Sequence, residues 1–421
     1  MLSKLRFVAG KITGSLWFRP AAYALVALLA LAATPVVEPF VPWQWKELVS
    51  SETNETVLSI LASSLLAVAI FSLSAMVAAL RAASNSATPR ARPLLVGDAA
   101  AQNAISTFIG AFLFSLLGVI GTLLGVFSPT GRVLLFVATL VLVFIVVATF
   151  IRWLQRLSNM GDVMEAIRRV EQAADAAFRT GAPLRRADAP DPPLYKDGAA
   201  IYAERPGFVQ AIALESLEGR CDALGRRARV TARIGDFVDA HAPLLRLDAP
   251  VADEDEEALR GALTIGDERR FDEDPRLGLI VLSEIASKAL SPGINDPGTA
   301  IGAIRAAQRV LDRWRRRAEP REALGGDTRV HLPPLSPEEV FECAFGPIVF
   351  DGWDRPEVAS TLLSVYAGLR DALPRLYGPA AEAMAADLIE RCGVMDHEAD
   401  RRRINAKAAR LGFAPEGGGR A

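Results

Sequence analysis

Residues 133–151 read VLLFVATLVLVFIVVATFI and contain no charged side chain. A helix rises about 1.5 Å per residue, so about 20 apolar residues cross a hydrocarbon core of about 30 Å. Helices of water-soluble proteins are rarely apolar on every face over such a length. The stretch therefore predicts a transmembrane helix.

Three more stretches in the N-terminal third share this character. They cover residues 21–37, 57–80 and 104–127, and none has a charge in its interior. Together with residues 133–151 they predict four membrane spans. Residues 1–19 before them are basic and predict an interfacial segment. A cleaved signal peptide is the alternative explanation, but the long lead and the three following spans favour retention of the first helix.

The segments that flank the predicted spans alternate in charge. The loop between the first two spans carries four glutamates against one lysine, whereas the loop after the second span carries three arginines against one aspartate. Arg152 and Arg156 follow the fourth span. Because Lys and Arg concentrate on the cytoplasmic side of short loops, we expect a multi-pass protein with both termini in the cytoplasm.

The charge of the remaining chain limits its partners. Residues 161–421 hold 36 Lys and Arg against 44 Asp and Glu, so this portion is mildly acidic. We therefore expect the lipid bilayer, and not nucleic acid, as a partner. The chain has three cysteines, all in this portion, which are too few and too scattered for a disulfide framework. A small number of scattered cysteines is typical of a protein in a reducing compartment.

A small β module is predicted in residues 204–250. Short runs such as GFVQAI and GDFV alternate apolar and polar residues next to glycine turns. The pattern is similar to that of lipoyl- and biotinyl-type barrel-sandwich modules. Those modules carry a modified lysine, but no lysine lies between Lys196 and Lys288. We therefore expect a small β-barrel or sandwich with a structural or adaptor role.

The sequence as a whole predicts an α-helical membrane protein with a mostly α cytoplasmic portion. Apolar residues recur at three- and four-residue steps from Trp153 to Ile167, which favours a stalk helix leaving the membrane. The predicted segments are a basic interfacial segment at 1–19, four transmembrane helices within 20–152, a stalk helix at 153–180, a linker at 181–203, the β module at 204–250, an α-helical domain at 251–411 and a disordered tail at 412–421.

The second predicted span has a face of small and hydroxyl-bearing residues. Ser59 and Ser63 lie four residues apart and share one side of a helix. Such residues allow membrane helices to pack closely, and they also line water-filled pores. Both interpretations stay open. The lack of ionisable residues in the four stretches argues against an ion-coupled transporter.

Residues 275–318 carry the most distinctive pattern outside the predicted spans. A predicted helix, in which Glu284 and Lys288 have the i,i+4 spacing of a supporting pair, breaks at SPGINDP, residues 291–297. Asp296 is the predicted N-cap of the next helix. The candidate contact or ligand residues around this helix are Arg269, Arg270, Asp272, Asp274, Asn295 and Asp296. The alternative is a capped helix–turn–helix with ion-paired neighbours.

Two motifs make the chain similar to a known family. ALSPGINDP at residues 289–297, preceded by RFDEDP at 270–275, resembles the signature of an uncharacterised bacterial family of predicted membrane proteins, the domain of unknown function 2254. FSL at 71–73, followed by ATPR at 87–90, resembles its second span and following loop, although ATPR stands where the family has a Ser-Pro-Arg run. The resemblance covers nearly the whole chain. It implies a protein of the bacterial inner membrane and brings no settled activity.

The sequence contains no recognisable catalytic or metal-binding pattern. A serine-hydrolase elbow, a P-loop, an HExxH motif and a CxxC pair are absent. We therefore expect no enzyme activity, no cofactor and no metal. The favoured hypothesis is a homo-oligomeric channel or passive pore with a cytoplasmic regulatory domain, lined by Ser59 and Ser63. The alternative is a non-conducting scaffold or sensor that binds a partner through its cytoplasmic domain.

Overall fold

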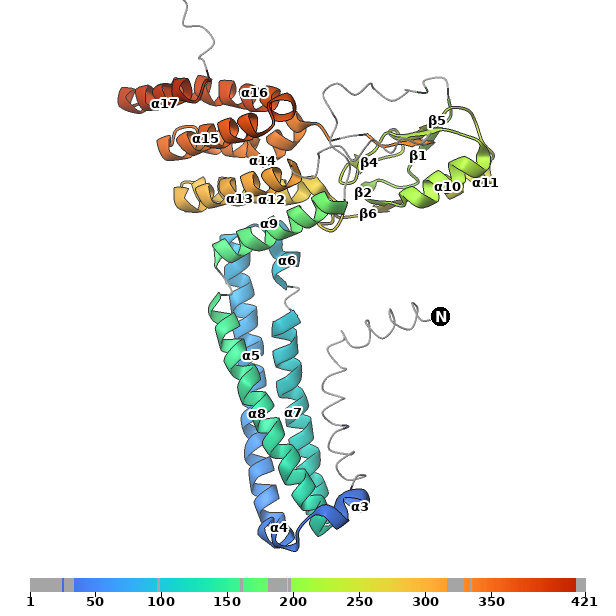
Figure 1. Ribbon diagram of the computed structural model, residues 1–421, viewed down its shortest axis with the longest axis vertical. Coiled ribbons are helices and arrows are strands. Elements are labelled where there is room, and N and C mark those ends of the chain that lie inside the picture. Colours follow the sequence, from blue (N-terminus) through green and yellow to red (C-terminus); the bar gives the residue numbers. More distant parts are fainter. Residues whose placement is uncertain are drawn as a thin grey trace, which may run out of the picture. The chain divides into compact units, whose positions relative to one another are not determined.

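The computed structural model divides the chain into two compact units (Figure 1). The membrane unit comprises Met1–Ser86 and Leu95–Asp162, and the C-terminal unit comprises Ala87–Leu94 and Val163–Ala421. The structure describes residues 34–96, 99–159, 162–180, 198–315, 329–333 and 335–413, together with Leu25 and Tyr195.

Three described helices of the membrane unit are long and apolar enough to cross a bilayer. They are α5 (Ser51–Ser86), α7 (Ala99–Leu123) and α8 (Pro129–Asn159), and their apolar windows are Ser51–Ala79, Asn103–Leu123 and Pro129–Leu157. The short elements α3 (Thr34–Val37), η1 (Glu38–Phe40) and α4 (Trp43–Leu48) precede them. The three predicted spans from residue 57 onward are thus confirmed by length and composition. Most of the first predicted span, 21–37, and the interfacial segment, 1–19, lie outside the described residues.

Small residues bring the membrane helices close together. A Cβ on Gly118 of α7 would lie 2.9 Å from a methyl group of Leu58 on α5, so a larger residue would require the Leu58 side chain to move. Leu58, Phe108 and Leu135 are fully buried in the core of the unit. Large apolar side chains on the outside, such as Phe144, remain exposed. This surface suits lipid and would be costly in water.

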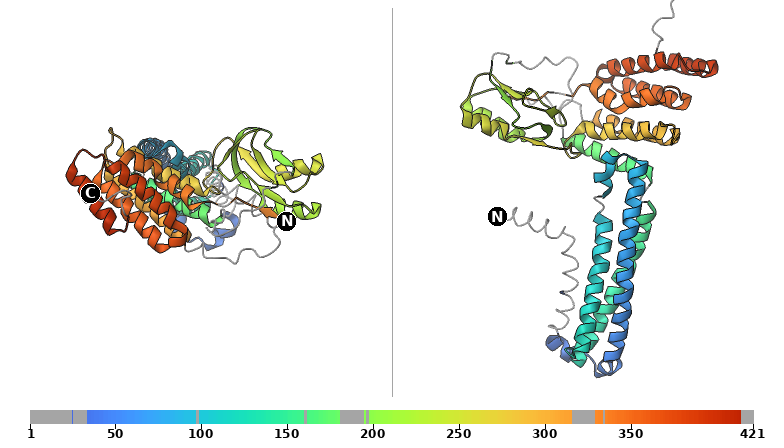
Figure 2. Two further views of the ribbon diagram at one scale, coloured as in Figure 1. Left: turned by 90° about the horizontal axis from the view of Figure 1, so that it is seen from above. Right: turned by 180° about the vertical axis from the view of Figure 1, so that it is seen from behind.

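The C-terminal unit contains a stack of helices. Its helices are α9 (Val163–Thr180), α12 (Pro275–Leu290), α13 (Pro297–Arg315), α14 (Pro337–Gly352), α15 (Pro356–Ala372), α16 (Pro374–Cys392) and α17 (Glu398–Arg410). The pair α12–α13 packs on the pair α14–α15, which packs in turn on α16–α17 (Figure 2). Helix α9 contacts the other side of α12 and α13.

The predicted stalk lies in two helices that belong to different units. Helix α8 ends at Asn159, and α9 begins at Val163. Helix α9 packs closely on the stack, because a Cβ on Gly278 of α12 would overlap Ala174 of α9. Glu171 of α9 also accepts hydrogen bonds from Arg309 and Arg313 of α13. The periodic apolar face of α9 is therefore used for packing within the C-terminal unit.

The β module consists of two open sheets around one core. Its elements are β1 (Ala200–Tyr202), β2 (Gly207–Ile212), α10 (Leu214–Leu224), β3 (Ala228–Val230), β4 (Phe237–Val238), β5 (Pro243–Leu247), α11 (Asp253–Arg260), β6 (Leu263–Gly266) and β7 (Val330–His331). The strand orders are β1-β5-β3-β7 and β4-β2-β6, and only the β3–β7 pair is parallel. Side chains from both sheets, such as Val209 and Leu245, share one buried cluster.

The barrel alternative is wrong for the described residues. Neither sheet pairs its first strand with its last, so each stays open. The module also recruits strands on both sides of the predicted range 204–250, namely β1, β6 and β7. Those strands are two to four residues long, which is too short to give a clear alternating pattern in the sequence.

Candidate functional site

Helix α12 separates the six predicted site residues into two groups. Its 16 residues span about 24 Å. Arg269, Arg270, Asp272 and Asp274 precede its first residue, whereas Asn295 and Asp296 follow its last. The structure therefore does not bring the six residues together.

Asp274 organises the group at the start of α12. Its carboxylate caps the helix by accepting hydrogen bonds from the backbone N–H groups of Arg276 (3.0 Å) and Leu277 (3.3 Å). The other carboxylate oxygen accepts from Nε of Arg269 at 2.6 Å. Asp274 is almost fully buried. A capping carboxylate with a guanidinium partner is a stable local arrangement.

Arg270 and Asp272 form a separate pair on the surface. The guanidinium of Arg270 donates to both carboxylate oxygens of Asp272, at 3.1 and 2.5 Å. The hydrogen bond from Arg270 lowers the pKa of Asp272. Both side chains are more than half exposed, so the pair contributes little to stability.

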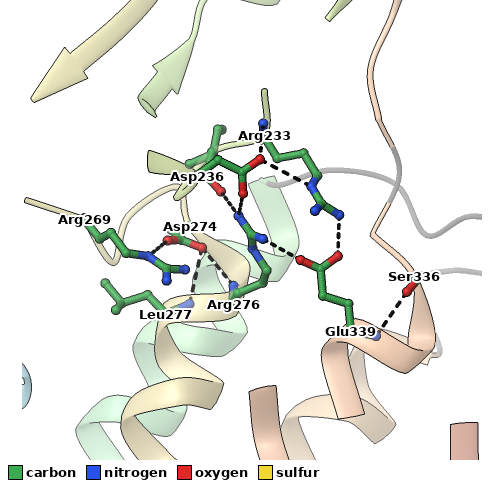
Figure 3. Close-up of polar contacts among 9 residues, drawn as sticks. Arg233, Asp236, Arg269, Asp274, Arg276, Leu277, Ser336 and Glu339 are labelled. Atoms are coloured by element: carbon green, nitrogen blue, oxygen red, sulfur yellow. Dashed lines mark hydrogen bonds and ion pairs between the residues drawn. The ribbon is translucent and has the colours of Figure 1, made fainter. Parts of the chain in front are cut away.

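Arg276 is the centre of a cluster that the sequence analysis missed (Figure 3). It donates to Glu339 (2.5 Å), to Asp236 (2.7 Å) and to the carbonyl of Ile234 (2.8 Å). Arg233 also contacts both Glu339 and Asp236. Burial opposes the charge of Arg276, but the hydrogen bonds to the two carboxylates outweigh it and raise the pKa.

We call Arg233, Asp236, Arg269, Asp274, Arg276 and Glu339 the arginine cluster. Its members come from the loop before β4, from the start of α12 and from the start of α14, so it ties the β module to the helical stack. It contains three guanidinium groups and three carboxylates. A shallow cleft of about 420 Å³ opens beside it, and both Arg269 and Arg276 line this cleft.

Two local features of the sequence indicate members of this cluster. Arg276 lies in the first turn of α12, where the helix macrodipole disfavours a cation. A positive charge there needs nearby carboxylates. Ser336 and Glu339 supply the other local signal, because Ser336 caps α14 by accepting from the N–H of Glu339 at 3.1 Å. Asp236 and Glu339 are 40 and 63 residues away from Arg276. The sequence around Arg276 therefore does not predict that it pairs with them.

The group at the end of α12 forms a tight turn. Asn295 has a φ of 53°, and its side-chain oxygen accepts from Nη1 of Arg355 at 2.5 Å. Asp296 accepts from the N–H (3.0 Å) and the hydroxyl (2.6 Å) of Thr299. These hydrogen bonds lower the pKa of Asp296. The predicted N-cap of α13 is thus confirmed, and this group fits the capped-turn interpretation.

The second half of α12 contacts the segment 87–94, which joins α5 to α7 in the chain. Lys288 donates to the carbonyl of Ala87 at 2.7 Å, and Glu284 forms an ion pair with Arg90. Arg169 of α9 donates to the carbonyl of Leu94 at 3.1 Å. Glu284 and Lys288 were predicted to pair with each other, and both contact the segment 87–94. This segment belongs to the C-terminal unit, although it lies between two membrane helices in the sequence.

The candidate pore residues lie on an exposed face of α5. Ser59 and Ser63 are exposed, while Leu58 and Leu65 on the other side are buried against the neighbouring helices. The hydroxyl of Ser63 donates to the carbonyl of Ile60 within the same helix at 3.0 Å. Among the described helices, these serines therefore take no part in packing.

The cysteines are poorly suited to nucleophilic chemistry. Burial raises the pKa of Cys221 and Cys343 to about 11 and that of Cys392 to about 12. Thiols of this kind stay protonated at neutral pH. Within the part of the chain that the structure describes, no group of three His, Cys, Asp or Glu side chains is placed to hold a metal ion.

Comparison with known proteins identifies relatives but no activity. Uncharacterised proteins of Mycobacterium bovis and Mycobacterium tuberculosis are each 32% identical to this chain over 122 residues, which are 27% of this chain and 23% of the relative. The matched region thus spans about a quarter of the length of these curated relatives. No solved structure matches. Residues 13–368 match the model of the family described as predicted membrane protein, domain of unknown function 2254, and the chain belongs to that family.

Proposed function

We propose that this membrane protein forms a homo-oligomeric passive channel regulated by its C-terminal unit. The observation that carries the proposal is a row of small and hydroxyl-bearing side chains on the exposed side of α5, where they alternate with apolar residues such as Ile60 and Ile70. Small or hydroxyl-bearing side chains recur along this face and are exposed: Thr56, Ser59, Ser63, Ala67, Ser74 and Ala78. Hydroxyl groups gain little from facing lipid, whereas they can face water in a pore or pack against another subunit.

The lack of ionisable side chains in three of the predicted spans favours passive conduction. Residues 57–80, 104–127 and 133–151 contain no ionisable side chain. Pumps and ion-coupled transporters usually carry such groups near the middle of the membrane. A pore that follows an existing gradient needs none.

The segment 87–94 supports a regulatory role for the C-terminal unit. This segment continues directly from α5, which ends at Ser86, and the unit holds it through Glu284, Lys288 and Arg169. We propose that a shift of α12 is passed along this segment of the chain to the end of α5. We place the C-terminal unit and both termini in the cytoplasm of a bacterium, in agreement with the charges of the loops.

The second candidate is a non-conducting scaffold or sensor. The same contacts with the segment 87–94 favour it, because they also transmit a signal in a protein without a pore. The two candidates differ in what crosses the membrane and share the regulatory use of α12.

Flux into liposomes separates the two candidates. Protein reconstituted into vesicles is expected to release a small entrapped ion or solute, and Ser63→Leu is expected to reduce this flux because it narrows and dries the polar face. Val141→Leu is the matched control, since Val141 is an exposed apolar residue of α8. Absence of flux, together with a monomeric mass in detergent, would exclude the channel and leave the sensor.

A further inference from the structure

We propose that the cleft beside Arg269 binds a small oxyanion, either a carboxylate or a phosphate, and that this ligand is the signal read by the C-terminal unit. The second half of this proposal rests on the regulatory role proposed above. The cleft volume of about 420 Å³ lies within the range of small-molecule sites, about 300–1,000 Å³. The loop around Gly235 and Phe237, the turn at Ala242, and both Arg269 and Arg276 line it.

Arg269 has hydrogen-bond donors without a partner. Its Nε donates to Asp274, whereas its Nη2 is buried and bonds to no described residue. Native proteins usually pair a buried donor with a protein group, a water or an ion. An arginine that lines a cleft and has a guanidinium nitrogen without a protein partner is suited to bind a carboxylate or a phosphate.

Gly235 allows the loop before β4 to approach Asp274 and Arg269 closely. It has a φ of +89°, and a Cβ built on it would lie 2.8 Å from Nη2 of Arg269 and would overlap the carboxylate of Asp274. Any other residue would be strained in this backbone conformation and would collide with the ion pair of Asp274 and Arg269. Gly235 thus places the loop that lines one side of the cleft directly against Arg269.

The unpaired groups of the cluster are donors, which favours a ligand with acceptor oxygens. Arg276 has a side chain that is 8% exposed, and its Nε, like Nη2 of Arg269, has no partner. The carboxylates of Asp236 and Asp274 already accept hydrogen bonds from arginines and from backbone N–H groups. A ligand that completes the site must therefore supply acceptor oxygens.

The wall of the cleft admits an apolar portion of the ligand. Phe237 is 61% exposed and packs edge-on against Phe208, and Pro243 lines the same cleft. An oxyanion attached to a compact apolar group fits this combination better than a highly charged polyphosphate. Inorganic phosphate and benzoate are therefore suitable probes of the two oxyanion classes.

Helix α12 connects the cleft with the segment 87–94. Arg276 in its first turn lines the cleft, and Glu284 and Lys288 near its other end hold residues 87–94. A ligand that shifts the start of this helix changes the position of Glu284 and Lys288, because a helix of this length moves as a unit. This is the physical link between binding and the end of α5.

Thermal unfolding of the full-length protein in detergent tests the binding site. Inorganic phosphate or benzoate is added at an ionic strength held constant with sodium chloride, and unfolding is followed by tryptophan fluorescence. We expect at least one probe to raise the unfolding temperature saturably. Arg269→Gln is expected to weaken the apparent affinity about tenfold or more, whereas the control Arg270→Gln, at the surface pair, is expected to leave it unchanged.

A second variant keeps the test valid if Arg269→Gln does not fold. Ala242→Trp changes an exposed residue that lines the cleft, and it is expected to abolish the saturable rise by occupying the cleft. The binding proposal fails if neither probe acts beyond chloride, if Arg270→Gln matches Arg269→Gln, or if Ala242→Trp still responds. Saturable binding by protein that conducts, with a flux that the probe does not change, would confirm the site and refute its regulatory role.

Discussion

At the residue scale, burial decides which ion pairs matter. Arg276 is 8% exposed and bonds to two carboxylates and a carbonyl, so Arg276→Leu leaves Asp236 and Glu339 with Arg233 alone. A hydrogen bond to a charged group contributes about 1.5–3 kcal/mol, and we expect a loss of this size in the free energy of unfolding of the C-terminal unit, measured by chemical denaturation in detergent. Arg270→Leu, at an exposed pair, should leave the denaturation midpoint within experimental error; equal effects of the two variants would contradict the assignment. The sequence was informative where a side chain acts on its own helix, as Asp296 does in capping α13. It was uninformative for Arg276, because its partners lie 40 and 63 residues away.

At the element scale, the structure assigns the segment 87–94 to the C-terminal unit rather than to the membrane unit that surrounds it in the sequence. Glu284 contributes an ion pair with Arg90, so Glu284→Gln is expected to increase hydrogen exchange of the amides in this segment, because removal of the charge weakens the contact that holds it. Glu257→Gln on the exposed face of α11 serves as the control, and protection that is equal in both variants would show that the ion pair is dispensable. Periodicity alone predicted α12 and the apolar face of α9, since both are long and amphipathic or apolar. It did not predict that α9 packs on α12 and α13, because the apolar pattern of a helix does not identify the element against which the helix packs. The strands β1 and β7, with three and two residues, were also too short for any pattern.

At the scale of the whole molecule, the distribution of apolar surface predicted a membrane protein, but a single chain does not reveal how copies assemble. In the proposed channel the polar face of α5 lies near the symmetry axis, so equivalent positions on neighbouring copies come close to one another. Ser63→Cys is therefore expected to form a disulfide-linked dimer when membranes are oxidised, whereas Val141→Cys on the exposed face of α8 should stay monomeric on a denaturing gel. The natural cysteines give little background, because burial raises the pKa of each of them to about 11 or 12 and keeps the thiols protonated. A dimer from Val141→Cys alone would place α8, and not α5, at the contact between copies, and the serine face would then lose its role as the pore lining. If neither variant cross-links and the mass in detergent is that of one chain, the polar face of α5 serves another purpose, and the sensor becomes the better description of the protein.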